Sequence, residues 1–358
     1  LYAIGKFKKK FENCKNLNSA IILSDLEGNS INIDTKNNFE TLYFNKIFDY
    51  TKLPNILDLF KFEKINDNYR LIQSEITIDE NIYIPANTNI IIDKGTKVMI
   101  INNSTLFSEG NLILNGSPQK KIMMHGDIKK GGAFVQINGS FKANNFEIKD
   151  LSQPANKNFL LYGGLNFVNS EVRIENTNIT NSKGEDGINL VNSKSILLNI
   201  KVNQIKSDGI DVDGGNFNFT NVNCFQILND CIDISGAKFN GQKVKADDIG
   251  DKVISVGENS KGKLQKLIVK NSNIGVAVKD SSYLELISMD SKKTNLDAVV
   301  FTKKEEFGPA SLTIKKYEGG DYDPKKFLIG KKNTLIIENN VINGEIKNKK
   351  IKKNLYLN

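Results

Sequence analysis

The sequence has 358 residues, of which 39% are hydrophobic and 25% are charged, a composition typical of a folded globular protein. Its formal net charge is +8, it lacks Trp, and its single histidine, His125, excludes any site that needs several histidines. The three cysteines, Cys14, Cys224 and Cys231, are too few for a disulfide framework, and no apolar run is long enough to span a membrane.

Residues 1–68 are the least regular part of the chain, and we expect them to form an N-terminal cap or a linker. A solenoid exposes strand edges at its ends, so its first coil needs such cover. Within this region TKLPNILDLFKF (51–62) predicts a short helix. The chain begins with Leu1 rather than Met, which indicates a processed or excised segment of a larger protein.

Residues 69–347 are predicted to form one repetitive β domain. From Asn81 to Gly126 apolar and polar residues alternate, with turn residues between the runs. This period of two indicates short strands, and we interpret the stretch as the opening coils of a solenoid.

A repeat of 22 residues is the strongest signal in the chain. DGINL (186–190) recurs as DGIDV (208–212) and DCIDI (230–234), and the register continues through KVISV (252–256) and IGVAV (274–278). Each unit is a strand rich in β-branched residues, and a second strand follows it. Repeats of this length made only of strands and turns stack as solenoids. The predicted fold class is therefore all-β, a right-handed parallel β-helix with about 22 residues per coil.

Stacking of the coils fixes the direction in which each side chain points, because alternate residues of a strand face opposite sides. The apolar positions form two inward columns: Ile188, Ile210, Ile232, Ile254 and Val276, then Leu190, Val212, Ile234, Val256 and Val278. The positions between and after them are expected to lie on an exposed outer face: Asn189, Asp211, Asp233, Ser255 and Ala277, then Asp213, Ser235, Gly257 and Lys279.

The end of the chain is predicted to hold a last coil and a basic tail. NTLIIENNVINGEI (333–346) resembles a final rung, and the lysine-rich residues 348–358 are expected to be a solvated tail. Between 183 and 258, by contrast, eight lysines face eleven acidic residues, a net charge of −3. The basic segments do not interleave aromatic residues with lysines, so we do not expect a nucleic-acid partner.

The coils DGIDVDGG, NDCIDISGA and IGDKVISVGENS resemble right-handed parallel β-helix repeat proteins of the pectate-lyase-like superfamily. More narrowly, they are similar to bacterial surface β-helix domains associated with CotH-like proteins. The resemblance covers roughly residues 75–345. It implies the fold and a cell-surface context, but this fold carries lyases, hydrolases, epimerases and inert adhesins. The polygalacturonase motifs are absent, and only Arg70 and Arg173 could serve as the arginines that the classical pectate lyases use.

The outer-face carboxylates are the candidate site. Asp211 and Asp213 are expected to lie about 6.6 Å apart along one strand, and Asp211 and Asp233 about 4.8 Å apart on adjacent coils. Retaining glycosidases separate their carboxyl groups by about 5–5.5 Å and inverting enzymes by about 6.5–9.5 Å. Both separations are available, so the sequence does not choose between them.

Calcium is a second interpretation, in which Asp211, Asp213 and Asp233 supply the oxygen ligands that this ion prefers. In a lyase, Lys252 or Lys279 would then act as the base, provided that its pKa were lowered. Structural calcium without catalysis, and plain solvated polar residues, remain open as further alternatives.

Other conspicuous residues have simpler interpretations. Asp186, Asp208 and Asp230 precede a Gly or Cys and are expected to form turns. Cys224 and Cys231 are expected to be buried free thiols. KKEEFGPA (303–310) breaks the repeat and predicts a loop over the groove.

The predicted function is that of an extracellular or cell-surface protein that binds or cleaves a polysaccharide on the outer face of its coils. As an enzyme it would be a polysaccharide lyase or a glycoside hydrolase. The alternative is a non-catalytic structural or adhesive rod of a surface protein or phage spike. The partner is a polysaccharide in the first case, and in either case the chain is expected to belong to a larger surface protein.

Overall fold

The structure is a computed structural model that describes residues 21–24, 30–33, 50–155, 161–320 and 323–356. The chain divides into two compact units, residues 1–52 and 53–358. The described part of the first unit is an antiparallel pair, β1 (Ile21–Ser24) and β2 (Ser30–Ile33), and the 3-10 turn η1 (Tyr50–Lys52). Most of the predicted cap at 1–68 therefore lies outside the described residues.

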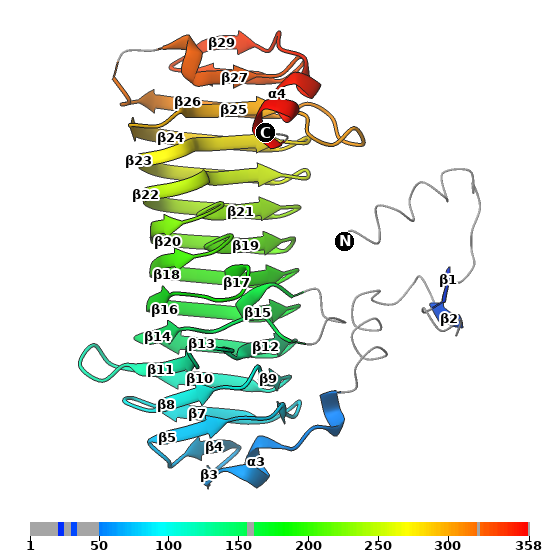
Figure 1. Cartoon of the computed structure of the whole chain (residues 1–358), viewed down its shortest axis with the longest axis vertical. Coiled ribbons are helices and arrows are strands. Elements are labelled where there is room, and N and C mark those ends of the chain that lie inside the picture. The colour runs from blue at the N-terminus through cyan, green and yellow to red at the C-terminus, as the bar shows by residue number, and fades with distance from the viewer. Residues whose placement is uncertain (1–20, 25–29, 34–49, 156–160, 321–322, 357–358) are drawn as a thin grey trace. The chain divides into compact units, whose positions relative to one another are not determined.

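The second unit is a right-handed parallel β-helix of about 11 turns of roughly 23 residues, as the repeat predicts. Its strands stack as rungs along one axis (Figure 1). No helix among the described residues is long and apolar enough to cross a membrane.

The N-terminal end of the β-helix is closed by a short helix and a hairpin. Helix α3 (Ile56–Leu59) confirms the predicted short helix, and the Asn55 side chain caps it by accepting the Leu57 N–H at 3.0 Å. Strand β3 (Phe62–Ile65) then pairs antiparallel with β4 (Asn68–Leu71), which lies parallel to β7.

The opening coils contain ten short strands. They are β5 (Glu75–Ile78), β6 (Ile82–Ile84), β7 (Asn89–Asp93), β8 (Lys97–Ile100), β9 (Thr105–Ser108), β10 (Asn111–Asn115), β11 (Ile122–Gly126), β12 (Ala133–Ile137), β13 (Ser140–Asn144) and β14 (Phe146–Lys149).

The remaining coils alternate short strands with longer, bent ones. They are β15 (Gly163–Val168), β16 (Glu171–Thr180), β17 (Asp186–Val191), β18 (Lys194–Ile205), β19 (Ile210–Asp213), β20 (Asn216–Ile227), β21 (Ile232–Ser235), β22 (Lys238–Gly257), β23 (Lys261–Lys279), β24 (Tyr283–Lys292), β25 (Leu296–Phe301), β26 (Ser311–Tyr317), β27 (Phe327–Ile329), β28 (Thr334–Ile337) and β29 (Asn340–Asn343).

The strand register confirms the predicted inward columns. Ile210 pairs with Ile188 on one side and with Ile232 on the other, and all three side chains are fully buried. The same register continues through Ile254 to Val276. The spacing of 22 residues thus stacks the inward apolar residues of each coil on those of the next, and these residues form the continuous core of the β-helix.

A ladder of asparagines turns the corner in the middle of the long strands. Asn176, Asn199 and Asn221 adopt left-handed backbone conformations, with φ values of 49°, 55° and 54°. Asn residues tolerate this region better than most non-glycine residues. The Asn199 side-chain amide donates to that of Asn176 at 3.0 Å, and Asn221 donates to Asn199 at the same distance. The corner therefore repeats identically from coil to coil.

The C-terminal end differs from the expected solvated tail. Strand β28 forms the last parallel rung, and β29 turns back antiparallel to it. Residues beyond it form helix α4 (Asn348–Tyr356) instead of a frayed tail. Ile351 of α4 is 1% exposed and packs against outward-facing Ala277 and Val299. The helix thus covers the outer face of the last coils with an apolar contact, while its lysines remain exposed.

Candidate active site

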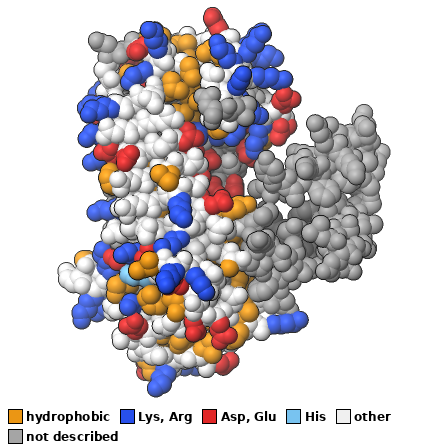
Figure 2. Space-filling model, viewed as in Figure 1, with side chains coloured by type: hydrophobic (Ala, Val, Ile, Leu, Met, Phe, Trp, Pro, Cys, Tyr) orange, Lys and Arg blue, Asp and Glu red, His pale blue; other side chains and the backbone are white. Residues whose placement is uncertain are grey.

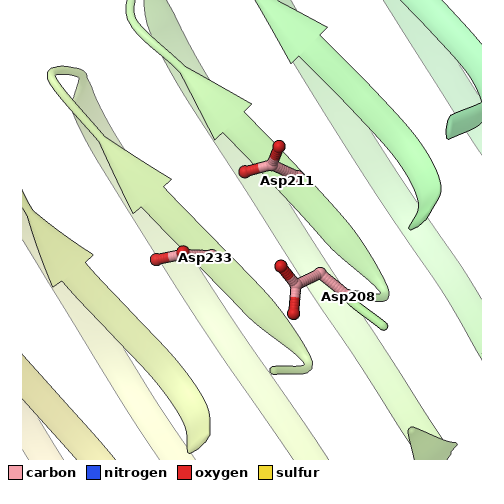
Figure 3. Close-up of side chains that lie close together, drawn as sticks. All are labelled: Asp208, Asp211 and Asp233. Atoms are coloured by element: carbon pink, nitrogen blue, oxygen red, sulfur yellow. The ribbon is translucent and has the colours of Figure 1, made fainter. Parts of the chain in front are cut away.

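Three carboxylates come together on the outer face of the central coils. Asp211 lies on β19, Asp233 lies beside it on β21, and Asp208 precedes β19 at the corner of the coil (Figure 3). One oxygen of each lies within 4.8 Å of the others. Two oxygens that bind one calcium at about 2.4 Å can be at most about 4.8 Å apart, so the spacing admits one shared cation.

The predicted set of carboxylates is thus brought together in part. Asp211 and Asp233 are neighbours, as the register requires, but the third member of the cluster is Asp208 and not Asp213. Asp213 lies further along β19, where it pairs with Ser235. The Asp that recurs before each repeat unit could have indicated that Asp208 belongs to the cluster, but Asp208 was predicted only to form a turn.

Asp186, Asp208 and Asp230 form a ladder at the corner where each rung begins. The Asp208 N–H donates to Asp186 Oδ1 at 3.2 Å, and the Asp230 N–H donates to Asp208 Oδ1 at 2.8 Å. The Lys252 N–H completes the series by donating to Asp230 Oδ1 at 2.9 Å. These aspartates therefore lie at turns, as predicted. They also link four successive coils, because each carboxylate accepts a backbone N–H from the next coil.

Burial, together with the crowding of the carboxyl groups, raises most of their pKa values. Burial, followed by the neighbouring Asp230 and Asp233, raises the pKa of Asp208 to about 9. Burial raises that of Asp186 to about 7, despite the N–H bond that it accepts. Burial and Asp213 raise the pKa of Asp211 well above its usual value. At neutral pH, therefore, part of this cluster holds protons.

Asp233 is the exception. Burial raises its pKa, but the ammonium group of Lys279, the neighbouring Ser255 side chain and the charge of Lys252 together outweigh burial, and its pKa is lowered. The outer face therefore places Asp233, whose pKa is lowered, next to Asp211, whose pKa is raised. Neighbouring groups with opposed proton affinities are the arrangement that acid–base catalysis uses.

Lys252 and Lys279 do not have the properties that the predicted base requires. Lys252 is 3% exposed, and its Nζ lies 3.1 Å from Asp230 Oδ1. Lys279 is 6% exposed, although it was expected on an exposed face. Burial lowers both pKa values, but Asp230 for Lys252 and Asp233 for Lys279 outweigh it, so both pKa values are raised. Both lysines stay protonated and act as fixed positive charges.

Lys303 is the lysine whose pKa moves in the direction of a base. Burial and the charges of Lys279 and Lys252 lower the pKa of Lys303 to about 8. Its Nζ lies 4.2 Å from the centre of the Tyr356 ring at the end of α4. Asp280 holds the loop, because its Oδ1 accepts the Lys303 N–H at 2.6 Å. The break in the repeat predicted the loop. The contact of Lys303 with the Tyr356 ring was not predicted.

Tyr162 supplies an exposed aromatic ring at the other side of the acidic cluster. Its backbone oxygen accepts the Asp186 N–H at 3.0 Å, and 36% of the residue is exposed. Burial and the charges of Glu185 and Asp186 raise its pKa, and those of Asp213 and Asp211 add to the effect. Figure 2 shows acidic side chains gathered at the level of β19, and lysines around the C-terminal end.

Cys224 and Cys231 form a disulfide, so the expectation of free thiols is wrong. Their Cα atoms lie 5.9 Å apart. The bond joins β20 to the residue that precedes β21, across the corner between the two strands. The strand pattern predicted that both cysteines are buried, but it did not predict the bond. It closes the turn that leads directly into Asp230 and Asp233.

Comparison with known proteins identifies similar folds and no family. No family model matches the sequence, and no curated protein matches it. A double mutant of the periplasmic alginate epimerase AlgG has a TM-score of 0.47 at 10% identity, covering 82% of this chain and 83% of that chain. Pectate lyase Pel9A has a TM-score of 0.37 at 10% identity, covering 68% and 72%. The Dettilon tailspike protein has a TM-score of 0.25 at 12% identity, covering 75% and 61%. These likenesses concern the β-helix fold alone.

Proposed function

We propose that the protein cleaves a polysaccharide on the outer face of β19 and β21. In this proposal Asp211 is the general acid and Asp233 is the nucleophile. The observation that carries it is that two carboxyl groups stacked in register have pKa values shifted in opposite directions: burial and other aspartates raise that of Asp211, and Lys279 lowers that of Asp233. Glycoside hydrolysis requires one protonated and one ionised carboxyl on either side of the scissile bond.

The short separation favours the retaining form of the reaction. The nearest oxygens of Asp211 and Asp233 lie within 4.8 Å, and retaining enzymes hold their two carboxyl groups about 5–5.5 Å apart. An inverting enzyme needs about 6.5–9.5 Å, because a water molecule must fit between base and sugar. Asp233 would therefore attack the sugar directly while Asp211 protonates the leaving oxygen.

Tyr162 supports a sugar as the substrate. An exposed tyrosine ring beside two carboxyl groups offers an apolar surface for a pyranose face and a hydroxyl for its edge. The β-helix supplies an extended surface, so a polymer can lie across several coils. The substrate class in this proposal is a polysaccharide.

A second candidate reaction is calcium-dependent β-elimination from a uronate. The spacing of Asp208, Asp211 and Asp233 fits an oxygen-ligated cation. A calcium ion there would neutralise the carboxylate of the uronate. Lys303, with its pKa lowered to about 8, would in its neutral form take the proton from the carbon next to that carboxylate. The bond from the β carbon to the glycosidic oxygen would then break, leaving a carbon–carbon double bond in the uronate and a hydroxyl on the departing sugar once that oxygen is protonated. Lys252 and Lys279 would contribute positive charge without exchanging a proton.

One screen distinguishes the two reactions. Neutral and uronate-containing polysaccharides are incubated with the protein in calcium or in chelator, and both reducing ends and unsaturated products are measured. Hydrolysis yields reducing ends without unsaturated product and survives chelation. Elimination yields unsaturated product and stops on chelation. Binding without cleavage in every arm would identify the protein as a non-catalytic rod.

The proposal places the protein outside the cell or at its surface, as part of a larger surface protein. The disulfide between Cys224 and Cys231 supports an oxidising compartment. Reaction with a thiol reagent under native and denaturing conditions, with protein isolated without reductant, tests this: the disulfide predicts no more than one reactive thiol per chain, that of Cys14.

A further inference from the structure

A groove lies on the outer face formed by the first halves of β18, β20, β22 and β23. It is lined by Ile196 and Leu198 and by the amide side chains of Asn218, Asn240, Gln242 and Gln265. These positions point outward because their neighbours Phe219 and Leu264 are in the core. No carboxylate is among the residues that line this groove, in contrast to the acidic cluster on β19 and β21.

Two pairs of lysines lie on this face, and one of them, Lys243 with Lys266, lines the groove itself. Lys238 pairs in register with Lys261, and Lys243 pairs in register with Lys266. Each pair therefore places two like charges on adjacent rungs, about 4.8 Å apart between backbones. Like charges directly opposite one another destabilise a sheet.

None of these four lysines forms a salt bridge within the described part of the chain, although lysines beside them do. Lys263 lies 2.8 Å from Glu285, and Lys194 lies 3.7 Å from Glu171. Of the lysines that line the groove, Lys263 is thus ion-paired. Lys316 lowers the pKa of Glu318, and the nearby charge of Lys266 adds to the effect. Among the described residues, however, neither Lys243 nor Lys266 has a carboxylate within salt-bridge distance. An anion between the lysines of a pair would relieve their mutual repulsion.

We propose that this amide–lysine face binds an anionic polysaccharide, with carboxylate or sulfate groups between the paired lysines. The amides of Asn218, Asn240, Gln242 and Gln265 both donate and accept hydrogen bonds, as sugar hydroxyl groups require. The lysine pairs repeat with the coil spacing, so they present charge at regular intervals to a polymer. This binding does not depend on cleavage at Asp211 and Asp233.

The groove suits a glycan better than a nucleic acid. Single-stranded nucleic acids bind by stacking successive bases on aromatic rings. The aromatic residue that lines this groove is Phe219, which is 2% exposed and offers no face for stacking. The cations are lysines and lack the planar fork with which arginine grips phosphate.

Binding measurements on charge variants test the proposal. The full chain is titrated with polygalacturonate, dextran sulfate, neutral dextran and an oligothymidylate. Two variants remove one lysine pair each, Lys238→Gln with Lys261→Gln and Lys243→Gln with Lys266→Gln. A matched control, Lys352→Gln with Lys353→Gln on α4, changes the net charge equally at exposed positions.

We expect each groove variant to weaken binding of a polyanionic glycan about fivefold, because two exposed ion pairs contribute about 0.5 kcal/mol each. The α4 control should bind as the wild type does. The polygalacturonate and dextran sulfate arms show whether carboxylate or sulfate is the preferred group.

Three results would overturn the proposal. The α4 control could weaken polyanion binding as much as the groove variants do, or neutral dextran could bind as tightly as the polyanions. Oligothymidylate could also bind more tightly than either polyanionic glycan and lose affinity in the groove variants. Cleavage of short oligosaccharides should be unchanged in the groove variants. Absence of cleavage by the wild type, together with polymer binding that depends on these lysines, would reject the proposed function and leave this inference standing.

Discussion

The acidic cluster predicts that the β-helix loses stability as the pH rises from about 5 to about 7. The usual pKa of Asp is 3.8, and in the folded protein that of Asp208 is about 9 and that of Asp186 about 7. Between these values the folded state binds more protons than the unfolded state. A raised folded-state pKa means that stability is fully present below the unfolded pKa and is lost as the pH rises through the folded pKa.

The expected slope follows from the number of retained protons. Each such carboxyl lowers the free energy of unfolding by up to about 1.4 kcal/mol per pH unit. Asp208 and Asp186 alone give up to about 2.8 kcal/mol per unit, but these carboxyls titrate as a coupled set with Asp211 and Asp213, so their contributions are not additive. We therefore expect about 1–2 kcal/mol per unit. Asp233, whose pKa is lowered, acts oppositely and only below its usual pKa.

Urea unfolding followed by circular dichroism at successive pH values measures this slope. Asp208→Asn removes one retained proton and should make the slope shallower by up to about 1.4 kcal/mol per unit. Asp248→Asn, at an exposed position of β22, is the matched control and should follow the wild type. Stability that rises between pH 5 and 7, or an Asp208→Asn slope parallel to the wild type, would refute the reasoning.

Two further predictions concern the packing around the site. Lys252→Met leaves Asp230, which is 2% exposed, without its ammonium partner, and should lower the free energy of unfolding in urea by about 3–5 kcal/mol. Adding Asp230→Asn to Lys252→Met should restore part of the lost free energy of unfolding, because it removes the unpaired charge. A double variant no more stable than Lys252→Met would contradict the pairing of Lys252 with Asp230. Gly241→Ala places a Cβ 2.2 Å from Phe219 Cζ, so overpacking should cost about 1–3 kcal/mol. Phe219→Leu in the same chain should offset that cost in thermal unfolding, whereas strictly additive losses would show that the ring does not fill this space.

The sequence predicts the fold and the columns of side chains because both depend on local periods. A spacing of 22 residues and a period of two place Ile210 over Ile188 and Asp211 beside Asp233 without any knowledge of distant contacts. Each rung is a neighbour of the rung one repeat away, so the register is visible in the chain itself.

Burial and charge at the site depend on contacts that the repeat does not contain. Lys252 lies 5.5 Å from the centre of the Tyr356 ring, which comes from a helix about a hundred residues later. Four of the nine residues of that helix are lysines, so the basic composition did not indicate its apolar contact through Ile351. Asp208 was predicted only to form a turn, because its hydrogen-bond partner on the next coil, the Asp230 N–H, is set by how the turns of adjacent coils stack.

The most direct test of the proposed site is the cleavage activity of isosteric variants of its two central carboxyl groups. Asp211→Asn and Asp233→Asn are compared with Asp248→Asn on the polysaccharide that the screen identifies. Both site variants should lose at least a hundredfold in rate, because acid–base groups contribute about 10²–10⁴-fold, while their circular dichroism matches the wild type. The control should keep full activity. Unchanged cleavage in Asp211→Asn and Asp233→Asn would contradict the account and leave these carboxylates as polar residues of the outer face.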